Sequence, residues 1–481
     1  MSLKLFGKNT VVYATGNIGA RAGSFLLIPL YTHFLSLGDY GLLATLLISI
    51  QIMLTLMSMG MRTTLLRFTK EYQVNNRIDD LLGTSSLINL LGSLIATGAS
   101  FAFFIPFFRC VLHSDDVYLY VGLACCAASL QSLNMHVISY YRARQEAVKY
   151  MIAGVSAAAL LFATSLVLVC VFKLSVTGAL LAVIITHGTI LLIVSMDVFS
   201  KAGFAISMSM MPQLLRFGCP LLFSNCGELV IGAAGIYFLS YFAGLDTVAI
   251  YSLGYKLTQL LGMTVVMPFS LAFQPYVFAN LDTPGIKERI SRLLTYLVLA
   301  VMSMSFLILL GSQILLPLIA PPEYSSAYLV ILLLLPGVAF VGVYYFGETL
   351  LGAVKKTHII GLAMAICAVL SIMLNYLLIP ILDWYGAAIS LNMSYILAGF
   401  TLLVIGMRRF SLAVEWKRIY ILGALMLFLF FAFFTVRDIN PILVSAGALI
   451  AALGGISVLL KAGFFHHDEI IAIKNLIPKP R

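Results

Sequence analysis

Three ionisable side chains interrupt long apolar stretches of this 481-residue chain: Arg21, Glu228 and Lys256. A charge in the middle of a hydrocarbon layer costs about 2.5–3.5 kcal/mol on insertion scales, so such residues face a partner or a water-filled cavity. The planar guanidinium of arginine donates two parallel hydrogen bonds and therefore suits phosphate oxygens. Two cations and one anion would make a shared cavity net positive, which favours an anionic head group.

Two amides lie close to these charges in the sequence, Asn17 beside Arg21 and Asn225 beside Glu228. We assign all five residues to a predicted substrate cavity. The alternative is a structural ion pair in which Glu228 neutralises Arg21 or Lys256. The two interpretations overlap, because a pair that opens during transport would serve both purposes.

A second basic group follows the predicted second apolar span. Arg62, Arg67 and Lys70 alternate with Leu65 and Phe68, which predicts a short amphipathic helix at the membrane surface. Ordinary membrane topology is enough to explain this charge. The functional alternative is a cytoplasmic access site, formed by Arg62 and Arg67, for anionic lipid heads.

The composition indicates that these residues lie on membrane-spanning helices. The chain is 61% hydrophobic and 10% charged. A soluble domain averages about 45–50% apolar residues and about 25% charged residues. Spans of about 20–26 residues are long enough to cross roughly 30 Å of hydrocarbon as helices. An all-α polytopic membrane protein with 14 transmembrane helices is predicted, with spans near 10–34, 40–61, 81–106, 118–141, 150–172, 178–200, 217–243, 247–275, 293–319, 326–352, 358–382, 386–407, 419–436 and 440–460.

Lys and Arg alternate strictly between the loops. Of 29 such residues, 24 fall in the two termini and every second loop, and only Arg109, Lys173 and Arg437 fall in the others. Because cytoplasmic loops carry the excess of Lys and Arg, this pattern predicts that both termini are cytoplasmic. The net charge of +10 is therefore loop charge, and no nucleic-acid partner is expected.

No metal or cofactor is expected. The seven cysteines show no CxxC-type spacing, and their predicted role is apolar packing. His136 and His187 lie singly within spans. A lone histidine in a helix bundle is more often packed and hydrogen-bonded than a proton relay. A coupling ion, H⁺ or Na⁺, stays open.

The chain contains a weak internal repeat. FLSLGDYG near Asp39 matches FAGLDTV near Asp246 at an offset of 207, and Gly178 matches Gly386 at 208. A unit of six spans is even, so both copies enter the membrane from the same side, as in transporters built from parallel repeats. The predicted organisation is two pseudo-symmetric six-helix lobes around a central cavity, at 1–206 and 207–410, followed by helices 13 and 14 at 411–460 and a cytoplasmic amphipathic tail at 461–481.

Five segments carry a resemblance to a known family. The sequence is similar to the polysaccharide-transport flippases, in the superfamily shared with multidrug-and-toxin exporters and the peptidoglycan-precursor flippase, over FLSLGDYG, GMRTTLLRFTKEY (60–72), LRFGCPLLFSN (215–225), YFAGLDTVAIYSLGYKL (241–257) and LNYLLIPILDWYGAA (374–388).

The resemblance implies a protein that moves a polyprenyl-pyrophosphate-linked oligosaccharide across the bacterial inner membrane, with no bond broken. The implied partners are that lipid-linked oligosaccharide, membrane lipids and, in the assembly pathway, a polysaccharide polymerase and a chain-length regulator. One departure stands out. Many relatives carry an Asp-Arg pair in span 7 where this chain has Gly235 and Ile236, which leaves Glu228 and Lys256 as the charges nearest that role.

Three other functions compete with this hypothesis. A multidrug exporter on the same fold would favour an acidic cavity for its cationic substrates. A peptidoglycan-precursor flippase would move a different glycan. An O-antigen polymerase or ligase would display a large outer loop with Arg, His or Glu, and the outer loops here are short and nearly free of Arg.

Overall fold

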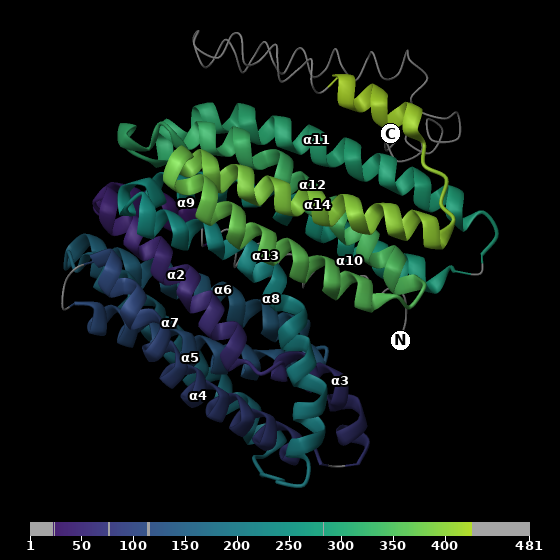
Figure 1. Cartoon of the computed structure of the whole chain (residues 1–481). Helices are drawn as coiled ribbons and strands as arrows, with labels where there is room; N and C mark the ends of the chain where they lie inside the picture. The colour runs from purple at the N-terminus through teal and green to yellow at the C-terminus, as the bar shows by residue number, and fades with distance from the viewer. Residues whose placement is uncertain (1–22, 24, 76, 113–115, 282, 426–481) are drawn as a thin grey trace, which may run out of the picture. The chain divides into compact units, whose positions relative to one another are not determined.

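The computed structural model describes residues 23, 25–75, 77–112, 116–281 and 283–425, and these form helices without any strand (Figure 1). A short apolar helix, Phe25–Phe34, precedes the others. The remaining elements are α2 (Leu37–Met57), α3 (Met61–Val74), α4 (Ile78–Leu112), α5 (Val117–Ala143), α6 (Ala147–Ser165), the π-helical turn η1 (Leu166–Val171), α7 (Ser175–Ala202), α8 (Met211–Phe242), α9 (Leu245–Leu261), the π-helical turn η2 (Gly262–Val266), α10 (Met267–Ala279), α11 (Ile286–Ile319), the 3-10 turn η3 (Pro322–Tyr324), α12 (Ala327–Ala353), α13 (Thr357–Leu382) and α14 (Trp384–Phe410).

The helices confirm a multi-pass membrane protein. Ten of them are long and apolar enough to cross a bilayer, and two shorter apolar helices, Phe25–Phe34 and Cys226–Phe242, also occur in the described ranges. Together they match the first twelve predicted spans. The predicted span 419–436 is described only to residue 425, and the span 440–460 and the tail 461–481 lie outside the described residues.

The chain divides into two compact units. The first comprises the described parts of 1–253 with 319–327 and 364–391, and the second comprises 254–318, 328–363 and the described part of 392–481. The lobes predicted at 1–206 and 207–410 are a statement about the sequence repeat, and their boundaries stay a prediction.

The repeat reappears in the helix boundaries. Equivalent helices start at offsets of 208 to 210 residues: α2 and α9 at Leu37 and Leu245, α4 and α11 at Ile78 and Ile286, α5 and α12 at Val117 and Ala327, α6 and α13 at Ala147 and Thr357, α7 and α14 at Ser175 and Trp384. The turns repeat as well. Gln145 and Lys355 both have positive φ, and each donates its N–H to the carbonyl three residues before it. Five pairs of helices in the described chain therefore follow the predicted repeat, and the six-helix lobes themselves stay a prediction.

Helix α5 is the centre of the first unit. It packs against α2, α3, α4, α6 and α7, and several of these neighbours lie side by side with it in Figure 1. Its buried face carries small residues, including Ala124, Ala127 and Ala128. Small side chains let helix backbones approach closely, which matters in a membrane because lipid is as apolar as leucine and supplies no hydrophobic drive between helices.

A break in the backbone between α2 and α3 sets the direction of α3, the amphipathic helix. Met59 and Gly60 have positive φ, and a Cβ on Gly60 would collide with the backbone of Gly218 on α8. The buried face of α3 then packs on α8, where Phe68 meets Phe217 edge to face and the Tyr72 hydroxyl donates to Gln213 at 3.1 Å. The amphipathic helix predicted after the second span is confirmed, since the buried residues of α3 recur at helical spacing.

In the second unit, Asn392 hydrogen-bonds to backbone groups of α12 next to a proline inside that helix. Pro336 lies inside α12 and removes a backbone donor. The Asn392 side chain of α14 enters the gap, where its Oδ1 accepts from the Gly337 N–H at 2.7 Å and its Nδ2 donates to the Leu333 carbonyl at 2.6 Å. These backbone groups thus keep hydrogen-bond partners at a depth where water is scarce.

Candidate functional site: a polar cavity in the first unit

The first unit contains a polar cavity of about 470 Å³. It is lined by Gly23, Arg62, Thr63, Leu66, Gln131, Asn134, Met135, Ile138, Ser139, Arg142, Tyr150, Gly154, Ala157, Ala158, Leu161 and His187. The contributions of α5 and α6 follow helical spacing, from Gln131 to Arg142 and from Tyr150 to Leu161, so each helix presents one continuous face to the cavity. Gln131 and Arg142 are eleven residues apart, and the cavity therefore runs about 16 Å along α5.

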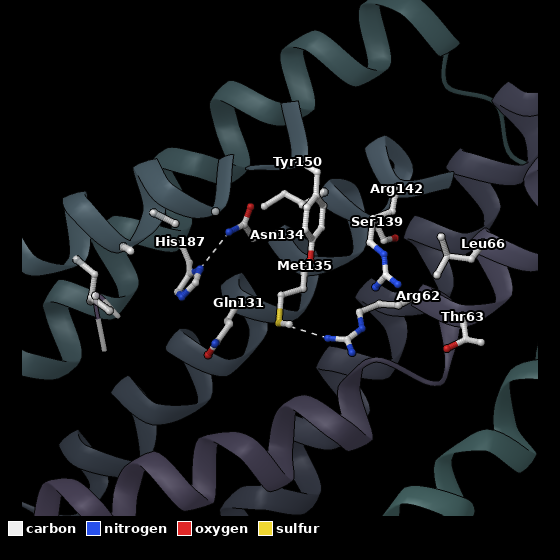
Figure 2. Close-up of a pocket in the computed structure, with 16 residues that line it drawn as sticks. Arg62, Thr63, Leu66, Gln131, Asn134, Met135, Ser139, Arg142, Tyr150 and His187 are labelled. Atoms are coloured by element: carbon white, nitrogen blue, oxygen red, sulfur yellow. Dashed lines mark hydrogen bonds between the residues drawn. The ribbon is translucent and has the colours of Figure 1, made fainter. Parts of the chain in front are cut away.

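Two arginines form one end of this cavity. Arg62 comes from the first turn of α3 and Arg142 from the last turn of α5, and Figure 2 shows their guanidinium groups near one another. They are close enough to repel each other electrostatically. Arg62 reaches the Met135 sulfur at 3.4 Å, and Arg142 lies 5.9 Å from the centroid of the Tyr150 ring. Neither has a carboxylate partner among the described residues.

Two acidic residues of the first unit, Asp197 and Glu146, pair with other cations. Asp197 on α7 accepts from Lys149 at 3.1 Å, from Lys201 and from the Tyr141 hydroxyl. Glu146 pairs with the same Lys149 at 3.0 Å. No carboxylate of the described residues therefore neutralises Arg62 or Arg142, which leaves a positive end that suits an anion.

The other end of the cavity is polar without charge. Asn134, which is 1% exposed, donates from Nδ2 to Nδ1 of His187 at 3.0 Å. Its Oδ1 accepts no hydrogen bond from any described residue. Figure 2 shows Gln131 on the same face of α5, one turn further from the arginines. This end therefore offers hydrogen-bonding groups and no ion.

Small residues of α6 form another part of the cavity wall. Gly154, Ala157 and Ala158 of α6 face the cavity. A Cβ on Gly23 would lie 2.6 Å from the Ala158 Cβ, so glycine is needed for the close approach of these two segments. Within the described ranges, no group of three or more His, Cys, Asp or Glu residues is placed to hold a metal ion.

The second repeat folds without these polar groups. At the 210-residue offset of α5 and α12, Arg142 corresponds to Gly352, Asn134 to Tyr344 and Gln131 to Val341. Since the same helix forms in both copies, the fold does not require the arginine or the amides. Their presence in one copy is therefore better explained by what the cavity binds.

A second cavity in the same unit has a different chemistry. It measures about 650 Å³ and lies among α2, α4, α8 and α13, with a lining that is aliphatic and aromatic apart from Ser100 and tyrosine hydroxyls. The Tyr237 hydroxyl in this wall already bonds Ser49 at 2.6 Å. Because it lacks charged groups, this cavity does not suit an anionic head group, and the polar cavity is the stronger candidate site.

The structure places the residues predicted from the sequence in several locations. Arg62 lines the polar cavity, whereas Arg67 is exposed, with its guanidinium 5.5 Å from the centroid of the Phe68 ring. Glu228 lies on α8 in the first unit, and Lys256 lies on α9 in the second. Neither is among the residues that line the polar cavity.

The other predicted residues cannot be assigned contacts. Asn17 and Arg21 fall outside the described residues, and Asn225 lies on α8 within a stretch whose side chains are not described. The predicted substrate cavity of Asn17, Arg21, Asn225, Glu228 and Lys256 therefore stays a prediction, as does the access site predicted for Arg62 and Arg67.

Of the residues that line the cavity, only Arg62 was predicted as a site residue; the polar residues that the sequence reasoning missed include Gln131, Asn134, Arg142 and Tyr150. Arg142 had been counted as loop charge because it follows the end of the predicted span 118–141. A signal was present in the spacing, since Gln131, Asn134, Ile138 and Arg142 recur every three or four residues and share one helical face. His187 was expected to be packed and hydrogen-bonded, and its bond to Asn134 confirms this.

Sequence comparison assigns the family. The profile of the polysaccharide biosynthesis protein family matches residues 6–281, more than half of the chain. The chain belongs to this family. The profile of the MatE family also matches residues 220–377. An uncharacterized membrane protein of Methanocaldococcus jannaschii is 21% identical over 402 residues, which are 77% of this chain and 78% of that protein.

Solved structures establish the fold of this polysaccharide biosynthesis protein. The lipid II flippase MurJ in an inward closed conformation aligns with a TM-score of 0.75 at 12% identity, covering 94% of this chain and 99% of MurJ. An outward-facing multidrug resistance transporter of the MATE family aligns with a TM-score of 0.55 at 17% identity, covering 84% and 96%. The chain therefore shares the fold of these two solved structures.

Proposed function

We propose that this protein is a flippase that moves a polyprenyl-pyrophosphate-linked oligosaccharide repeat unit across the bacterial inner membrane, for O-antigen, capsule or exopolysaccharide synthesis. The observation that carries the proposal is the pair Arg62 and Arg142, two cations in one polar cavity without a carboxylate partner among the described residues. The activity makes and breaks no covalent bond.

The chemistry of the pair fits a pyrophosphate. Each guanidinium offers a planar fork of donors that matches two phosphate oxygens, and charge-assisted hydrogen bonds are roughly twice as strong as neutral ones. Two like charges held together destabilise the empty cavity and are relieved by an anion. By the alternation of loop charge, this end of α5 faces the cytoplasm, the side on which lipid-linked oligosaccharides would be collected.

Two competing functions on the same fold make different demands on this site. A drug exporter would bind cations, and a cavity with two unneutralised arginines repels them. A peptidoglycan-precursor flippase would use the same pyrophosphate chemistry with another glycan. The family match to polysaccharide biosynthesis favours the oligosaccharide substrate over both.

The remaining features of the proposal follow from sequence. Both termini are cytoplasmic, H⁺ or Na⁺ is the coupling ion if one is used, and a polymerase and a chain-length regulator act on the product. The charges Arg21, Glu228 and Lys256 stay part of the proposed substrate route on the sequence argument alone, and the polar cavity is the proposed initial head-group site.

Transport by reconstituted protein tests the proposal. The full chain is placed in liposomes that contain undecaprenyl-pyrophosphate-linked oligosaccharide, and periodate outside the vesicles measures the fraction of glycan that reaches the outer leaflet over time. We expect Arg62→Gln and Arg142→Gln each to lower the initial rate at least tenfold, because each removes one bidentate phosphate contact. Lysine at either position should restore only part of the rate, since it lacks the fork.

A neighbouring arginine supplies the matched control. Arg144 lies at the end of α5, exposed and outside the cavity, at 3.9 Å from Glu146. Arg144→Gln should therefore transport at the wild-type rate. Wild-type transport by the double variant Arg62→Gln/Arg142→Gln would reject the cavity as the phosphate site, and transport of ethidium but not of the glycan lipid would favour a drug exporter.

A further inference from the structure

The uncharged end of the polar cavity has its own ligand chemistry. Asn134 lines the cavity and is buried; its Nδ2 lies 3.0 Å from Nδ1 of His187, and its buried Oδ1 accepts no hydrogen bond from the described residues. A buried polar atom left without a partner costs about 1–3 kcal/mol. Exchanging the amide oxygen and nitrogen, with the other histidine tautomer, would still leave one buried polar atom of Asn134 without a partner among the described residues.

The groups at this end select for a neutral ligand with hydroxyl groups. Asn134, Gln131 and His187 supply both donors and acceptors in their uncharged forms. Gly154, Ala157 and Ala158 also line the cavity and give it small apolar wall residues. A pyranose ring has the matching character, with hydroxyl groups around its edge and C–H groups on its faces.

The distance between the two ends also fits a sugar next to a phosphate. Asn134 and Arg142 are eight residues apart on one face of α5, which is about 12 Å along the axis. The arginine side chain covers part of that length. The volume of about 470 Å³ falls within the range of about 300–1,000 Å³ typical of small-ligand sites. It suits a phosphate-linked single sugar and is too small for an entire oligosaccharide with its lipid.

We propose that Asn134, Gln131 and His187 form a subsite for the first sugar of the lipid-linked glycan, the sugar attached to the pyrophosphate that Arg62 and Arg142 hold. This inference rests on the proposed flippase function and adds the residues that determine glycan selectivity. The second repeat supports it, because Tyr344 and Val341 replace the two amides there without loss of the helix.

The competing explanation is a structural bond between α5 and α7. Asn134 and His187 do join these helices. A purely structural pair would alter folding and the binding of every ligand equally, whereas a sugar subsite alters the preference between ligands. The ratio of two affinities is therefore the informative measurement.

Binding of two probes to the full chain in nanodiscs tests the subsite. The probes are undecaprenyl pyrophosphate alone and the same lipid carrying one hexose or N-acetylhexosamine, drawn from a panel of glucose, galactose and N-acetylglucosamine. Wild type should bind one sugar-bearing lipid at least tenfold more tightly than the bare lipid. In Asn134→Leu that ratio should fall about tenfold, which is the size of one lost neutral hydrogen bond with its buried partner group.

Two further variants keep the test decisive. Gln131→Ala removes a side chain that makes no hydrogen bond to the described residues, so it should fold even where Asn134→Leu does not, and it should also lower the ratio. Asn375→Leu makes the same change as Asn134→Leu at a buried site on α13, where the amide bonds its own helix at Ser371, and should leave the ratio unchanged.

The outcomes separate this inference from the proposed function. If Arg62→Gln and Arg142→Gln weaken both probes while Asn134→Leu and Gln131→Ala leave the ratio intact, the flippase site stands and the sugar subsite is wrong. An equal loss for both probes in Asn134→Leu with no effect of Gln131→Ala assigns a structural role and also overturns the subsite. If neither probe binds wild type, the proposed function itself fails.

Discussion

At the scale of single residues, the proposed function depends on whether a basic side chain has an acidic partner. Arg62 and Arg142 resemble many other basic residues near the ends of apolar helices. Lys149 on α6 and Lys201 on α7, by contrast, both pair with Asp197. The two arginines differ because the described residues around them include no carboxylate partner. An uncompensated pair of like charges is costly to hold together, and a bound anion removes that cost.

A single added carboxylate should therefore inactivate the cavity. Ile138 lines it one turn before Arg142, and the equivalent position in the second repeat is Glu348. In Ile138→Glu, the new carboxylate would face Arg142 at the i,i+4 spacing that favours ion pairs. We expect at least a tenfold lower affinity for undecaprenyl pyrophosphate in nanodiscs.

The neutral variant Ile138→Gln separates charge from shape. It places a side chain of nearly the same size in the cavity and should keep most of the affinity. If Ile138→Gln were as damaging as Ile138→Glu, the loss would reflect crowding, and the electrostatic account of the arginine pair would be wrong.

At the scale of elements, backbone breaks decide where side chains point. The positive φ of Met59 and Gly60 ends α2 and starts α3 in a new direction, which brings Arg62 to the cavity. Arg67 is five residues further, about 1.4 turns, and thus on nearly the opposite side of the helix. Pro336 creates a comparable break in α12, where Asn392 satisfies the backbone groups of Gly337 and Leu333.

The proline and the asparagine should be coupled energetically. Asn392→Leu leaves the Gly337 N–H and the Leu333 carbonyl without Asn392, at about 1–3 kcal/mol for each unsatisfied group. In a Pro336→Ala background the helix can straighten and pair these two groups with each other. Thermal unfolding in detergent should show a clear drop in Tm for Asn392→Leu alone and a much smaller drop when it is added to Pro336→Ala.

A double-mutant cycle quantifies this coupling. We expect an interaction energy of at least about 1 kcal/mol, the value of a typical hydrogen bond. Additive effects of the two substitutions would show that Asn392 stabilises the protein by another contact.

At the scale of the whole molecule, one six-span motif is used twice with different chemistry. Helix starts repeat at 208 to 210 residues, and even the turns at Gln145 and Lys355 share their hydrogen bonds. The polar cavity belongs to the first copy, where Arg142 and Asn134 stand in place of Gly352 and Tyr344. The repeated helices thus form the scaffold, and the residues that differ between the two copies form the polar cavity.

The orientation of the molecule is open to direct measurement. The alternation of Lys and Arg predicts that positions 246 and 323 face outward and that positions 356 and 409 face the cytoplasm. Single cysteines at these positions, in a variant with the seven native cysteines replaced, should be labelled by an impermeant maleimide from outside only at 246 and 323. External labelling at 356 would overturn the topology and, with it, the cytoplasmic position of Arg142.

The sequence by itself determined the class of protein, the first twelve spans and the repeat. Hydropathy and loop charge are local properties, because a helix in lipid must satisfy its own backbone and cannot place Lys or Arg freely along its length. The offset of 207 between Asp39 and Asp246 can likewise be read from the sequence alone, and five pairs of helix starts lie at the similar offsets of 208 to 210. The amphipathic helix at α3 also followed from spacing alone.

Only the tertiary structure decided which polar residues share a cavity. Arg62, Arg142 and His187 come from three helices, and their meeting depends on how α3, α5 and α7 pack. Sequence spacing gives the angle between residues within one helix but not the rotation of that helix against its neighbours. Arg62 and Arg67 were therefore equivalent as sequence, and packing placed Arg62 in the cavity and left Arg67 exposed beside Phe68.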